Sequence, residues 1–324
     1  MISFPKDVEN SFQRSKPHIR NTPLEHSPYL SKMINGNVYL KLDNIQKTGS
    51  FKFRGAVSKM TSLNENEIAN GVVTASTRNH GAACSLAMSL LNIKGKIVVP
   101  ENVHKNKVEN IKNLGGEVEY FGNDCINAEE HAQKISMNTG ATYISPYNDP
   151  NIVSGQGTLG LEILNELNTL DSVFISVGGG GLISGVGGYL KSMEKNIKMF
   201  GVSPENSCVM YESLKAGKQL DLPSKETLSD GTAGGVEIGS ITFKLCQEII
   251  DEFILVDEEE IAAGIRIGIK KHHQLIEGAA GTAIAGFLKK KEDLKGQTVV
   301  IVMCGGNISS VSYTHLTLPT NREV

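Results

Sequence analysis

The chain has 324 residues, of which 40% are hydrophobic and 21% charged, which is the composition of an ordinary globular protein. This length is enough for one large hydrophobic core or two moderate ones. The formal net charge is -3, and no long run of lysine and arginine gives the chain the electrostatic signature of a protein that binds nucleic acid or an anionic membrane. No apolar run approaches the ~20 residues that a membrane-spanning helix needs.

The N-terminal segment and the cysteines indicate a cytoplasmic protein. The segment from Met1 to Lys16 is polar and lacks the apolar core of a signal peptide. A disulfide framework would have denser cysteines in even number, and a zinc site would have them in closely spaced pairs. Here they are far apart, so we predict five reduced thiols, which are Cys84, Cys125, Cys208, Cys246 and Cys304.

Short runs rich in valine and isoleucine alternate with longer amphipathic stretches. The expected strands are Val38–Leu42, Val72–Ala75, Ile97–Val99, Val118–Phe121, Val173–Val177, Met199–Val202, Phe253–Val256 and Val299–Met303. The expected helices include Asn79–Leu91, Ala128–Met137, Leu182–Met193, Glu258–Lys271 and Ala279–Lys289. This alternation predicts an α/β protein with mostly parallel sheets, in which ligands bind beyond the carboxyl ends of the strands. Residues that follow strands are therefore the candidates for a functional site.

The first candidate is Lys52, in the segment K-T-G-S-F-K-F-R-G-A from Lys47 to Ala56, which follows a predicted strand. A lysine at the start of a helix, between the apolar Phe51 and Phe53, can be partly desolvated. Desolvation favours the neutral amine, which is the nucleophile that condenses with an aldehyde. The alternative is a solvated lysine on a helix surface, which is the common case.

A run of four glycines lies between a predicted strand and a predicted helix, in S-V-G-G-G-G-L-I-S-G from Ser176 to Gly185. Glycines allow successive backbone N–H groups to turn toward one anion, and the start of a helix adds its positive end. The run predicts a phosphate cup. It lacks the lysine and hydroxyl of G-x-x-x-x-G-K-[ST], so a P-loop nucleotidase is not expected. The alternative is a mobile loop.

Two further segments also follow strands. The segment T-A-S-T-R-N-H-G, from Thr74 to Gly81, offers hydroxyl, amide and backbone donors that suit a carboxylate, although it also suits a simple helix N-cap. The segment M-C-G-G-N, from Met303 to Asn307, places a small weak donor or acceptor before two glycines. Its alternative is a plain buried cysteine before a turn.

Together these segments resemble the fold-type II pyridoxal-phosphate (PLP) enzymes, and among them the serine/threonine dehydratase and serine racemase group. S-F-K-F-R-G-A, S-x-x-N-H-G, S-V-G-G-G-G-L and C-G-G-N occur in this order, and the resemblance covers the chain from about Asn21 to Ser309. The resemblance implies two three-layer α/β domains similar to tryptophan synthase β. Residues 1–70 and 149–310 would form the larger, cofactor-binding domain and residues 71–148 the smaller, substrate-binding one.

The resemblance also implies roles for single residues. Lys52 would form the Schiff base and move the proton at Cα, Phe51 would pack against the cofactor ring, and Asn79 would hydrogen-bond the ring hydroxyl. Cys304 would face the pyridine nitrogen, with Glu277 near the ring. The cofactor phosphate would be bound by the backbone of Gly178, Gly179, Gly180, Gly181 and Leu182. The substrate would be bound by Ser76, Thr77, Arg78, His80, Asp230 and Gly231.

The implied reaction is the removal of water from a small hydroxy-amino acid, with a 2-oxo acid and ammonia as products. Threonine would give 2-oxobutanoate and serine would give pyruvate. Unlike an aspartate, Cys304 cannot keep the ring nitrogen protonated, so the cofactor would be a weaker electron sink, which suits β-elimination better than transamination. The loop from Ser229 to Glu237 resembles the substrate-side loop of the dehydratases, closest to the hydroxyectoine-utilisation type.

Two positions depart from the pattern of the group. Racemases of this group carry a serine where this chain has Thr77, whose hydroxyl could return a proton to Cα, so amino-acid racemisation stays open as a catalytic alternative. Arg78 stands where a glycine is usual. It could point to solvent or pair with a surface acid, or it could receive a second substrate carboxylate, as in 3-hydroxyaspartate. A third possibility is an inactive PLP or amino-acid binder in which Arg78 blocks the site.

Some relatives bind a divalent cation through a glutamate and an aspartate. Glu205 matches the first ligand, but Tyr211 stands at the second position and is a poor ligand for a hard cation, so we predict no strong Mg²⁺ or Ca²⁺ site. The resemblance to this group also predicts a homodimer. After Ser310 the sequence V-S-Y-T-H-L-T-L-P-T-N-R-E-V has no helical period, and residues 311–324 are expected to be an aberrant or disordered tail.

Overall fold

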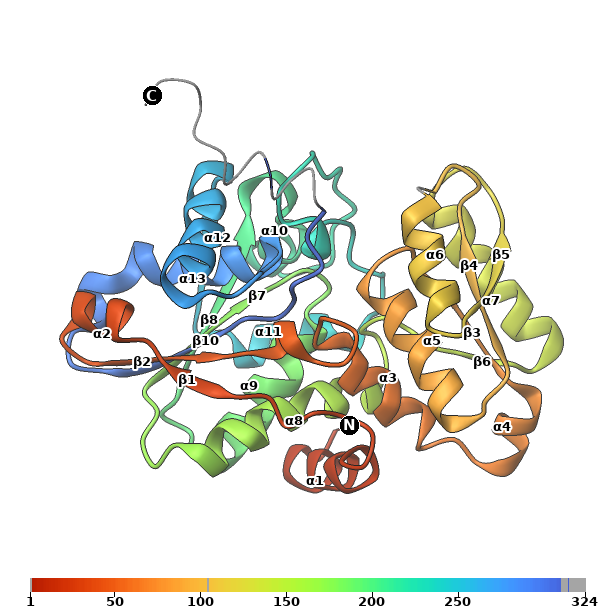
Figure 1. Ribbon diagram of the computed structural model, residues 1–324, viewed down its shortest axis with the longest axis horizontal. Helices are drawn as coiled ribbons and strands as arrows, with labels where there is room; N and C mark the ends of the chain where they lie inside the picture. The colour runs from red at the N-terminus through yellow and green to blue at the C-terminus, as the bar shows by residue number, and fades with distance from the viewer. Residues whose placement is uncertain (1, 104, 310–313, 315–324) are drawn as a thin grey trace.

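The computed structural model describes residues 2–103, 105–309 and 314, and its described elements form two sheets with helices packed against them (Figure 1). The larger sheet has the strand order β1-β2-β10-β7-β8-β9, and only the β1–β2 pair is antiparallel. Its strands are β1 (Leu24–His26), β2 (Asn37–Lys41), β7 (Ser172–Ser176), β8 (Lys198–Pro204), β9 (Glu252–Val256) and β10 (Thr298–Val302).

The smaller sheet is parallel throughout and has the order β5-β4-β3-β6. Its strands are β3 (Val72–Ala75), β4 (Gly95–Val99), β5 (Glu117–Tyr120) and β6 (Thr142–Tyr143). The predicted α/β architecture with mostly parallel sheets is therefore confirmed. All eight predicted strands are present, with ends shifted by a few residues, but β1 and β6 were not predicted.

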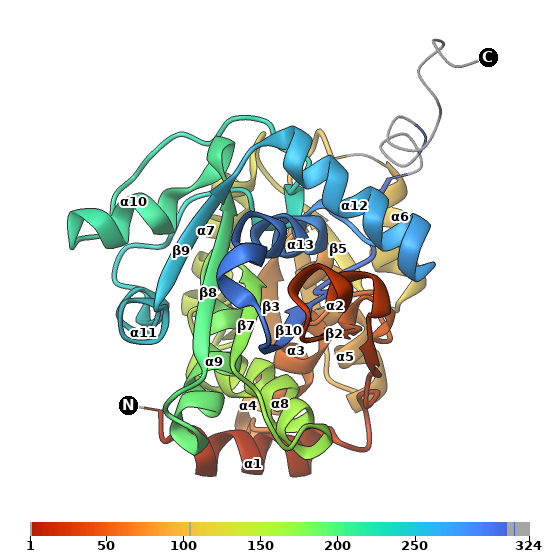
Figure 2. The same cartoon turned by 90° about the vertical axis from the view of Figure 1, so that its left-hand side faces the viewer.

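Helices cover the two sheets. Those of the first half of the chain are α1 (Phe4–Ser15), α2 (Pro28–Ile34), α3 (Lys52–Met60), α4 (Glu65–Asn70), α5 (Asn79–Leu91), α6 (Lys105–Asn113) and α7 (Cys125–Thr139). Those of the second half are α8 (Pro150–Glu166), α9 (Gly181–Met193), α10 (Val209–Ala216), α11 (Ile241–Ile249), α12 (Glu258–His272) and α13 (Gly278–Lys290). In both views α12 and α13 lie on one side of the larger sheet, and α8 and α9 lie on the other (Figure 2).

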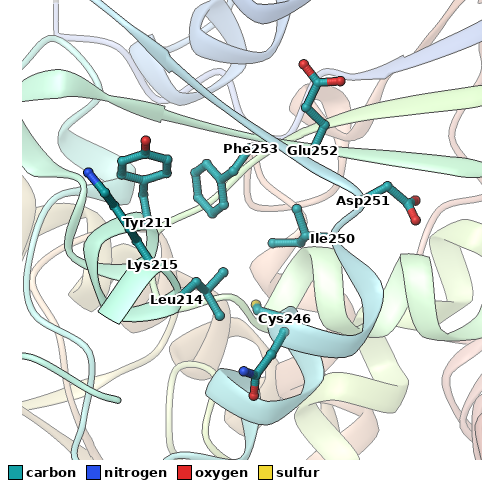
Figure 3. A pocket seen from close by; sticks show the side chains of 9 residues that line it. Tyr211, Leu214, Lys215, Cys246, Ile250, Asp251, Glu252 and Phe253 are labelled. Carbon is teal, nitrogen blue, oxygen red and sulfur yellow. The ribbon is translucent and has the colours of Figure 1, made fainter. Parts of the chain in front are cut away.

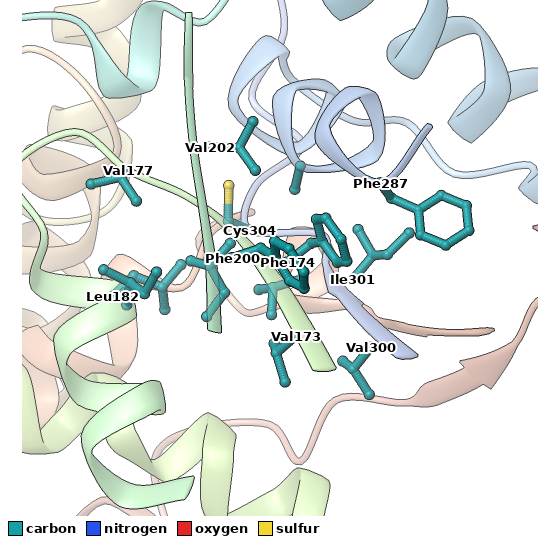
Figure 4. Close-up of a cluster of buried hydrophobic side chains, with 14 of the residues drawn as sticks. Val173, Phe174, Val177, Leu182, Phe200, Val202, Phe287, Val300, Ile301 and Cys304 are labelled. Atoms are coloured by element: carbon teal, nitrogen blue, oxygen red, sulfur yellow. The ribbon is translucent and has the colours of Figure 1, made fainter. Parts of the chain in front are cut away.

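The core of the larger sheet is built around three aromatic rings (Figure 4). Phe174 on β7 stacks on Phe200 of β8 with ring centroids 4.3 Å apart, and Phe287 of α13 meets Phe174 edge-on at 5.9 Å. Such pairs add to the stabilisation that apolar burial gives the strands. Val302 and Cys304 belong to the same buried cluster. This core therefore fixes the ends of β7 and β10, where the glycine run and Cys304 follow.

Helix α3 lies between the two sheets. Its residues Phe53 and Val57 are buried in the core of the smaller sheet with Ile97 of β4. On its opposite side, α3 approaches α8 so closely that a Cβ added at Gly155 would lie 2.8 Å from Cα of Gly55. The first residue of this helix is Lys52, so the lysine is positioned by packing against the core of the smaller sheet on one side and against α8 on the other.

A buried cluster of charges fixes the start of α3. The Arg54 guanidinium is fully buried and is held by Asp43 at 2.8 Å and by Glu162 of α8 at 2.6 Å. Lys41, also fully buried, lies 2.8 Å from the same Glu162. Burial alone would lower the pKa of Arg54, but the two carboxylates outweigh it and raise that pKa. The cluster ties the end of β2, the start of α3 and the middle of α8 together.

The remaining structural expectations concern thiols, membranes and the tail. The cysteines are free in the described part of the chain, and no helix there is both long and apolar enough to cross a membrane. The predicted tail, residues 311–324, lies outside the described residues except for Thr314.

Candidate active site

One pocket at the carboxyl ends of β7 and β10 collects most of the predicted site. It is lined by all ten residues expected to bind the cofactor and by Gly231 from the predicted substrate loop. The other lining residues are Tyr147, Ser176, Thr232 and Ala279. The sheet topology explains this convergence, because the carboxyl ends of neighbouring parallel strands open on the same edge.

Lys52 reaches into this pocket as a half-buried side chain. Its position is fixed by the backbone of Phe51, whose N–H donates to the Cys304 carbonyl at 3.0 Å. The Lys52 amine donates to the carbonyl of Pro146 at 2.9 Å and lies 5.2 Å from the centroid of the Phe51 ring. Burial lowers the pKa of Lys52 from 10.5 to about 8, although Cys84, Cys304 and Glu277 oppose this shift. At pH 7 about one-tenth of the amine is then neutral and nucleophilic.

The glycine run is enclosed on three sides, and each glycine is too crowded to carry a Cβ. A Cβ at Gly178 would lie 2.7 Å from the Thr232 carbonyl, and one at Gly179 would lie 2.5 Å from Cε1 of Tyr147. Gly180 has a φ of +80°, and a Cβ there would lie 2.6 Å from the Cys246 sulfur. Helix α9 begins directly after it. The run therefore has both the conformation and the helix terminus that an anion-binding cup requires.

Asn79 and Glu277 form one hydrogen-bonded group with Asn307. The Asn79 amide donates to both Glu277 oxygens at 2.9 and 3.0 Å, and the Asn307 backbone N–H donates to the same carboxylate at 3.2 Å. The Asn307 amide donates to Asn79 Oδ1 at 2.7 Å. Burial raises the pKa of Glu277, which these donors oppose. The group fixes the Asn79 side chain at one edge of the pocket. Asn307 belongs to the C-G-G-N segment, but its hydrogen bonds to Asn79 and Glu277 were not predicted.

Cys304 is buried directly after β10. Its sulfur lies 3.4 Å from the Ser176 hydroxyl, and burial raises the pKa of the thiol to about 12. The thiol is therefore neutral at physiological pH. A neutral thiol can share a hydrogen bond with a ring nitrogen, but it offers no negative charge to keep that nitrogen protonated.

The residues predicted to hold the substrate carboxylate lie outside the lining of this pocket. Ser76 and Thr77 are half-buried in the loop between β3 and α5. His80 is buried, with Nε2 3.1 Å from the Thr74 hydroxyl and 3.0 Å from the Ile144 carbonyl. Burial, together with the charge of Lys52, lowers the pKa of His80 to about 3, so the ring is neutral. These contacts direct the imidazole toward the smaller sheet.

Arg78 pairs with Asp230 across a separation of 152 residues. One guanidinium nitrogen lies 2.5 Å from the Asp230 carboxylate, and another donates to its backbone carbonyl. Asp230 begins the 3₁₀ turn Asp230–Thr232, and Lys107 of α6 lies 3.8 Å from the same carboxylate. The two side chains are 40% and 55% exposed, so the pair lies at the surface and solvent screens it. Its position beside Gly231 and Thr232 places it next to the pocket.

The two positions considered for a cation lie apart from this pocket. Tyr211 packs edge-on against Phe253 at 5.5 Å and lines a separate hollow with residues of α10 and α11 (Figure 3). Within the described residues, no three histidine, cysteine or acidic side chains gather in a way that could hold a metal ion.

The prediction of no strong cation site can be tested by heat denaturation. We expect millimolar Mg²⁺ or Ca²⁺ to leave the melting temperature of the protein unchanged, because a ligand stabilises a fold only when it binds the folded state. A marked rise with either ion would contradict the prediction, and K⁺ at equal ionic strength is the control.

Tyr147 is the main residue of the pocket that sequence reasoning missed. It follows β6, a strand of two residues, and sits in the connection from the smaller sheet to α8. A pattern of alternating apolar residues cannot be read over so short a strand, so the position gave no sign that it follows one.

The pocket fits an aldehyde cofactor that carries a phosphate. Lys52 supplies a partly neutral amine, and Cys304 supplies a neutral thiol. The glycine run has no room for side chains and leads directly into the N-terminus of α9. These features are those expected of an enzyme that uses such a cofactor. Residues 15–305 match the family of pyridoxal-phosphate dependent enzymes, and the chain belongs to this family.

Relatives and solved structures agree with this assignment. The chain is 41% identical over 303 residues to an L-threonine ammonia-lyase of Thermotoga maritima, covering 94% of this chain and 75% of that protein. It resembles the processed form of threonine deaminase isoform 2 from Solanum lycopersicum with a TM-score of 0.91, 34% identity, and coverage of 97% and 91% of the two chains. Maize serine racemase gives a TM-score of 0.90, 30% identity, and coverage of 96% and 97%.

Proposed function

We propose that this protein is a threonine/serine ammonia-lyase that removes water from a small hydroxy-amino acid. The observation that carries the proposal is the partly neutral Lys52 amine, which shares one pocket with the glycine cup and the neutral Cys304 thiol. The relatives named threonine ammonia-lyase and threonine deaminase support the same reaction.

The residues of this chain divide the work between binding and proton transfer. When bound, pyridoxal phosphate supplies an electron sink at the α-carbon of the amino acid. The backbone N–H groups of the glycine run would hold its phosphate, and Asn79, fixed by Glu277 and Asn307, would hold its ring hydroxyl. The free Lys52 amine would accept the α-proton while Pro146 O keeps that amine in place.

The overall bond changes balance without an added oxidant or reductant. The α-hydrogen and the β-hydroxyl leave as water, and the enamine that remains hydrolyses to a 2-oxo acid and ammonia. The neutral Cys304 thiol offers no negative charge that would keep a bound ring nitrogen protonated, so the cofactor would be a weaker electron sink, which favours loss of the β-hydroxyl.

The test is to incubate the protein with PLP and measure ammonia and 2-oxo acid from L-threonine, L-serine and L-threo-3-hydroxyaspartate. Equal amounts of ammonia and 2-oxo acid would support the lyase. A PLP-loaded protein that releases neither would contradict it.

Racemisation is a second candidate, favoured by the likeness to maize serine racemase and by Thr77. The Thr77 hydroxyl lies in the loop between β3 and α5, where it could return a proton to Cα from the side opposite Lys52. Formation of D-serine from L-serine, followed on a chiral column, would support it. An inactive binder, with Arg78 blocking the site, would take up PLP and give neither product.

The depressed pKa of Lys52 predicts how the capture of PLP depends on pH. Only the neutral amine adds to an aldehyde, so the rate should rise with pH up to about 8 and then level off. An ordinary lysine would keep gaining reactivity up to its pKa of 10.5. The rate is read from the absorbance change when apoprotein and PLP are mixed, with Nα-acetyl-lysine as the control. A rate that still rises steeply above pH 9 would contradict the shift.

Arg78 is proposed as a determinant of substrate choice. In this structure its guanidinium is occupied by Asp230, so a substrate with a second carboxylate would have to compete with that pair. If it does, Arg78→Gly should lower kcat/KM for 3-hydroxyaspartate relative to threonine by about tenfold or more, because a bidentate charge pair is lost. If Arg78→Gly leaves the ratio of kcat/KM for the two substrates unchanged, Arg78 does not select the substrate. Its role is then limited to the ion pair with Asp230.

The remaining predictions concern organisation. We propose that residues 1–70 and 149–310 form the larger domain, that residues 71–148 form the smaller one, and that the protein acts as a homodimer in the cytoplasm. The strands of the smaller sheet, which run from Val72 to Tyr143, support the proposed inner boundary.

A further inference from the structure

Tyr147 contacts the glycine run directly. A Cβ added at Gly179 would lie 2.5 Å from Cε1 of the tyrosine ring, and one at Gly181 would lie 2.8 Å from the tyrosine Cβ. Gly179 and Gly181 must therefore lack a side chain not only to expose their N–H groups but also to make room for Tyr147. The ring occupies the space that a side chain at Gly179 would take, and the Cβ and backbone of Tyr147 occupy the space at Gly181, so the run cannot move toward this residue.

The hydroxyl of the same side chain is bound on the other side of the pocket. The backbone N–H of Glu237 donates to Tyr147 Oη at 2.8 Å, and the N–H of Ile241 donates to Oδ1 of the neighbouring Asn148 at 3.0 Å. Burial raises the pKa of Tyr147 to about 12, so the phenol that accepts the Glu237 bond stays neutral across the physiological range. The segment from Glu237 to Ile241 begins at the last residue of the predicted substrate loop.

The backbone beside Tyr147 also holds the reactive amine, because Pro146 O accepts the hydrogen bond from Lys52. Residues 146–148 therefore contact the lysine, the glycine run and the segment from Glu237 to Ile241. These three parts of the pocket lie on α3, before α9 and before α11, far apart in the sequence.

We propose that Tyr147 is a positioning residue that clamps the glycine run in its anion-binding shape and ties it to the segment from Glu237 to Ile241. The inference rests on the proposed role of the glycine run as the phosphate cup, but not on which amino acid is turned over. The ring and the hydroxyl carry separate parts of this role, so two substitutions can separate them.

The first variant, Tyr147→Leu, removes the ring. Its affinity for PLP and for inorganic phosphate should each fall by about tenfold or more, because the glycine run loses the surface that holds its shape. The ³¹P resonance of bound PLP should also shift, which a general loss of stability would not cause. Affinity is measured by equilibrium dialysis, in the natural chain and again with Lys52→Ala, where the covalent bond no longer contributes.

The second variant, Tyr147→Phe, keeps the ring and removes the hydroxyl. It should bind PLP within about threefold of the natural chain, while the amide of Glu237 exchanges its hydrogen faster. Tyr143→Leu, four residues away and outside the pocket lining, is the matched control and should change neither readout. Folding of each variant is checked by circular dichroism.

The clamp is overturned if folded Tyr147→Leu binds PLP and phosphate like the natural chain, with an unshifted ³¹P resonance. It is also overturned if Tyr143→Leu weakens binding equally. Should Tyr147→Leu fail to fold, Tyr147→Phe with unchanged Glu237 exchange would contradict the tie to that segment. Binding is measured without substrate, so absent lyase activity would count against the proposed reaction and not against the clamp.

Discussion

Replacement of Lys52 by alanine is expected to lower the release of ammonia from threonine by about 10⁴-fold or more. The reason is that the proposed mechanism gives this side chain two roles: the amine that bonds to the cofactor aldehyde, and the base that takes the α-proton. A positioned base alone contributes about 10²- to 10⁴-fold. PLP should still bind through the glycine cup, although more weakly and without the absorbance of the lysine-bound form.

Lys59→Ala is the matched control for this experiment. Lys59 lies on the same helix, pairs with Asp149 at 2.8 Å, and does not line the pocket. Its loss should leave turnover nearly unchanged. Turnover in Lys52→Ala above about one-hundredth of that in the natural chain would mean that another group serves as the base, since loss of a positioned base should lower turnover by at least about 10²-fold.

Replacement of Arg54 by alanine is expected to destabilise the fold by about 3–5 kcal/mol. Arg54 donates to Asp43, Glu162 and the Thr158 hydroxyl, and all of these groups are buried. Without the guanidinium, Asp43 loses its cationic partner, and Glu162 keeps only Lys41. The loss comes mainly from leaving carboxylates in the interior without full compensation, and only in part from the interaction that is removed.

The effect of Arg54→Ala is measured as the change in the urea midpoint of the apoprotein, so that cofactor binding does not add to stability. Arg266→Ala on α12 is the control and should change the free energy of unfolding by no more than about 0.5 kcal/mol. A loss below about 1 kcal/mol for Arg54→Ala would mean that water enters the cluster and replaces the missing partner.

The strands and the pocket could be predicted because both depend on short stretches of sequence. Valine and isoleucine runs mark β7 and β10, and the residues after them, Gly178 and Cys304, meet because parallel strands end on the same edge. The resemblance to a known family then assigned roles, and the structure brings the predicted cofactor residues into one pocket.

Other features could not be predicted because they depend on packing across the chain. Helix α8 is buried on nearly every side and has no single apolar stripe, so its period of 3.6 residues is hidden. The pairing of Arg78 with Asp230 and of Asn79 with Glu277 joins residues that no spacing relates. Tyr147 was missed because the strand before it is too short to show a pattern, and because the glycines it contacts lie more than 30 residues further along the chain.

The placement of α3 between the two sheets has a consequence for local opening of the molecule. Releasing this helix would expose apolar surface of the smaller core and uncover the Arg54 charge cluster at the same time. Its amides should therefore open only in the rarest fluctuations, with free energies close to that of global unfolding. The loop that carries Arg78 and the 3₁₀ turn that begins at Asp230 both lie at the surface and should open far more often. The Lys52 amine, which is proposed to hold the cofactor, therefore lies on one of the elements expected to open least, while the exposed Arg78–Asp230 pair next to the pocket lies on segments expected to open more readily.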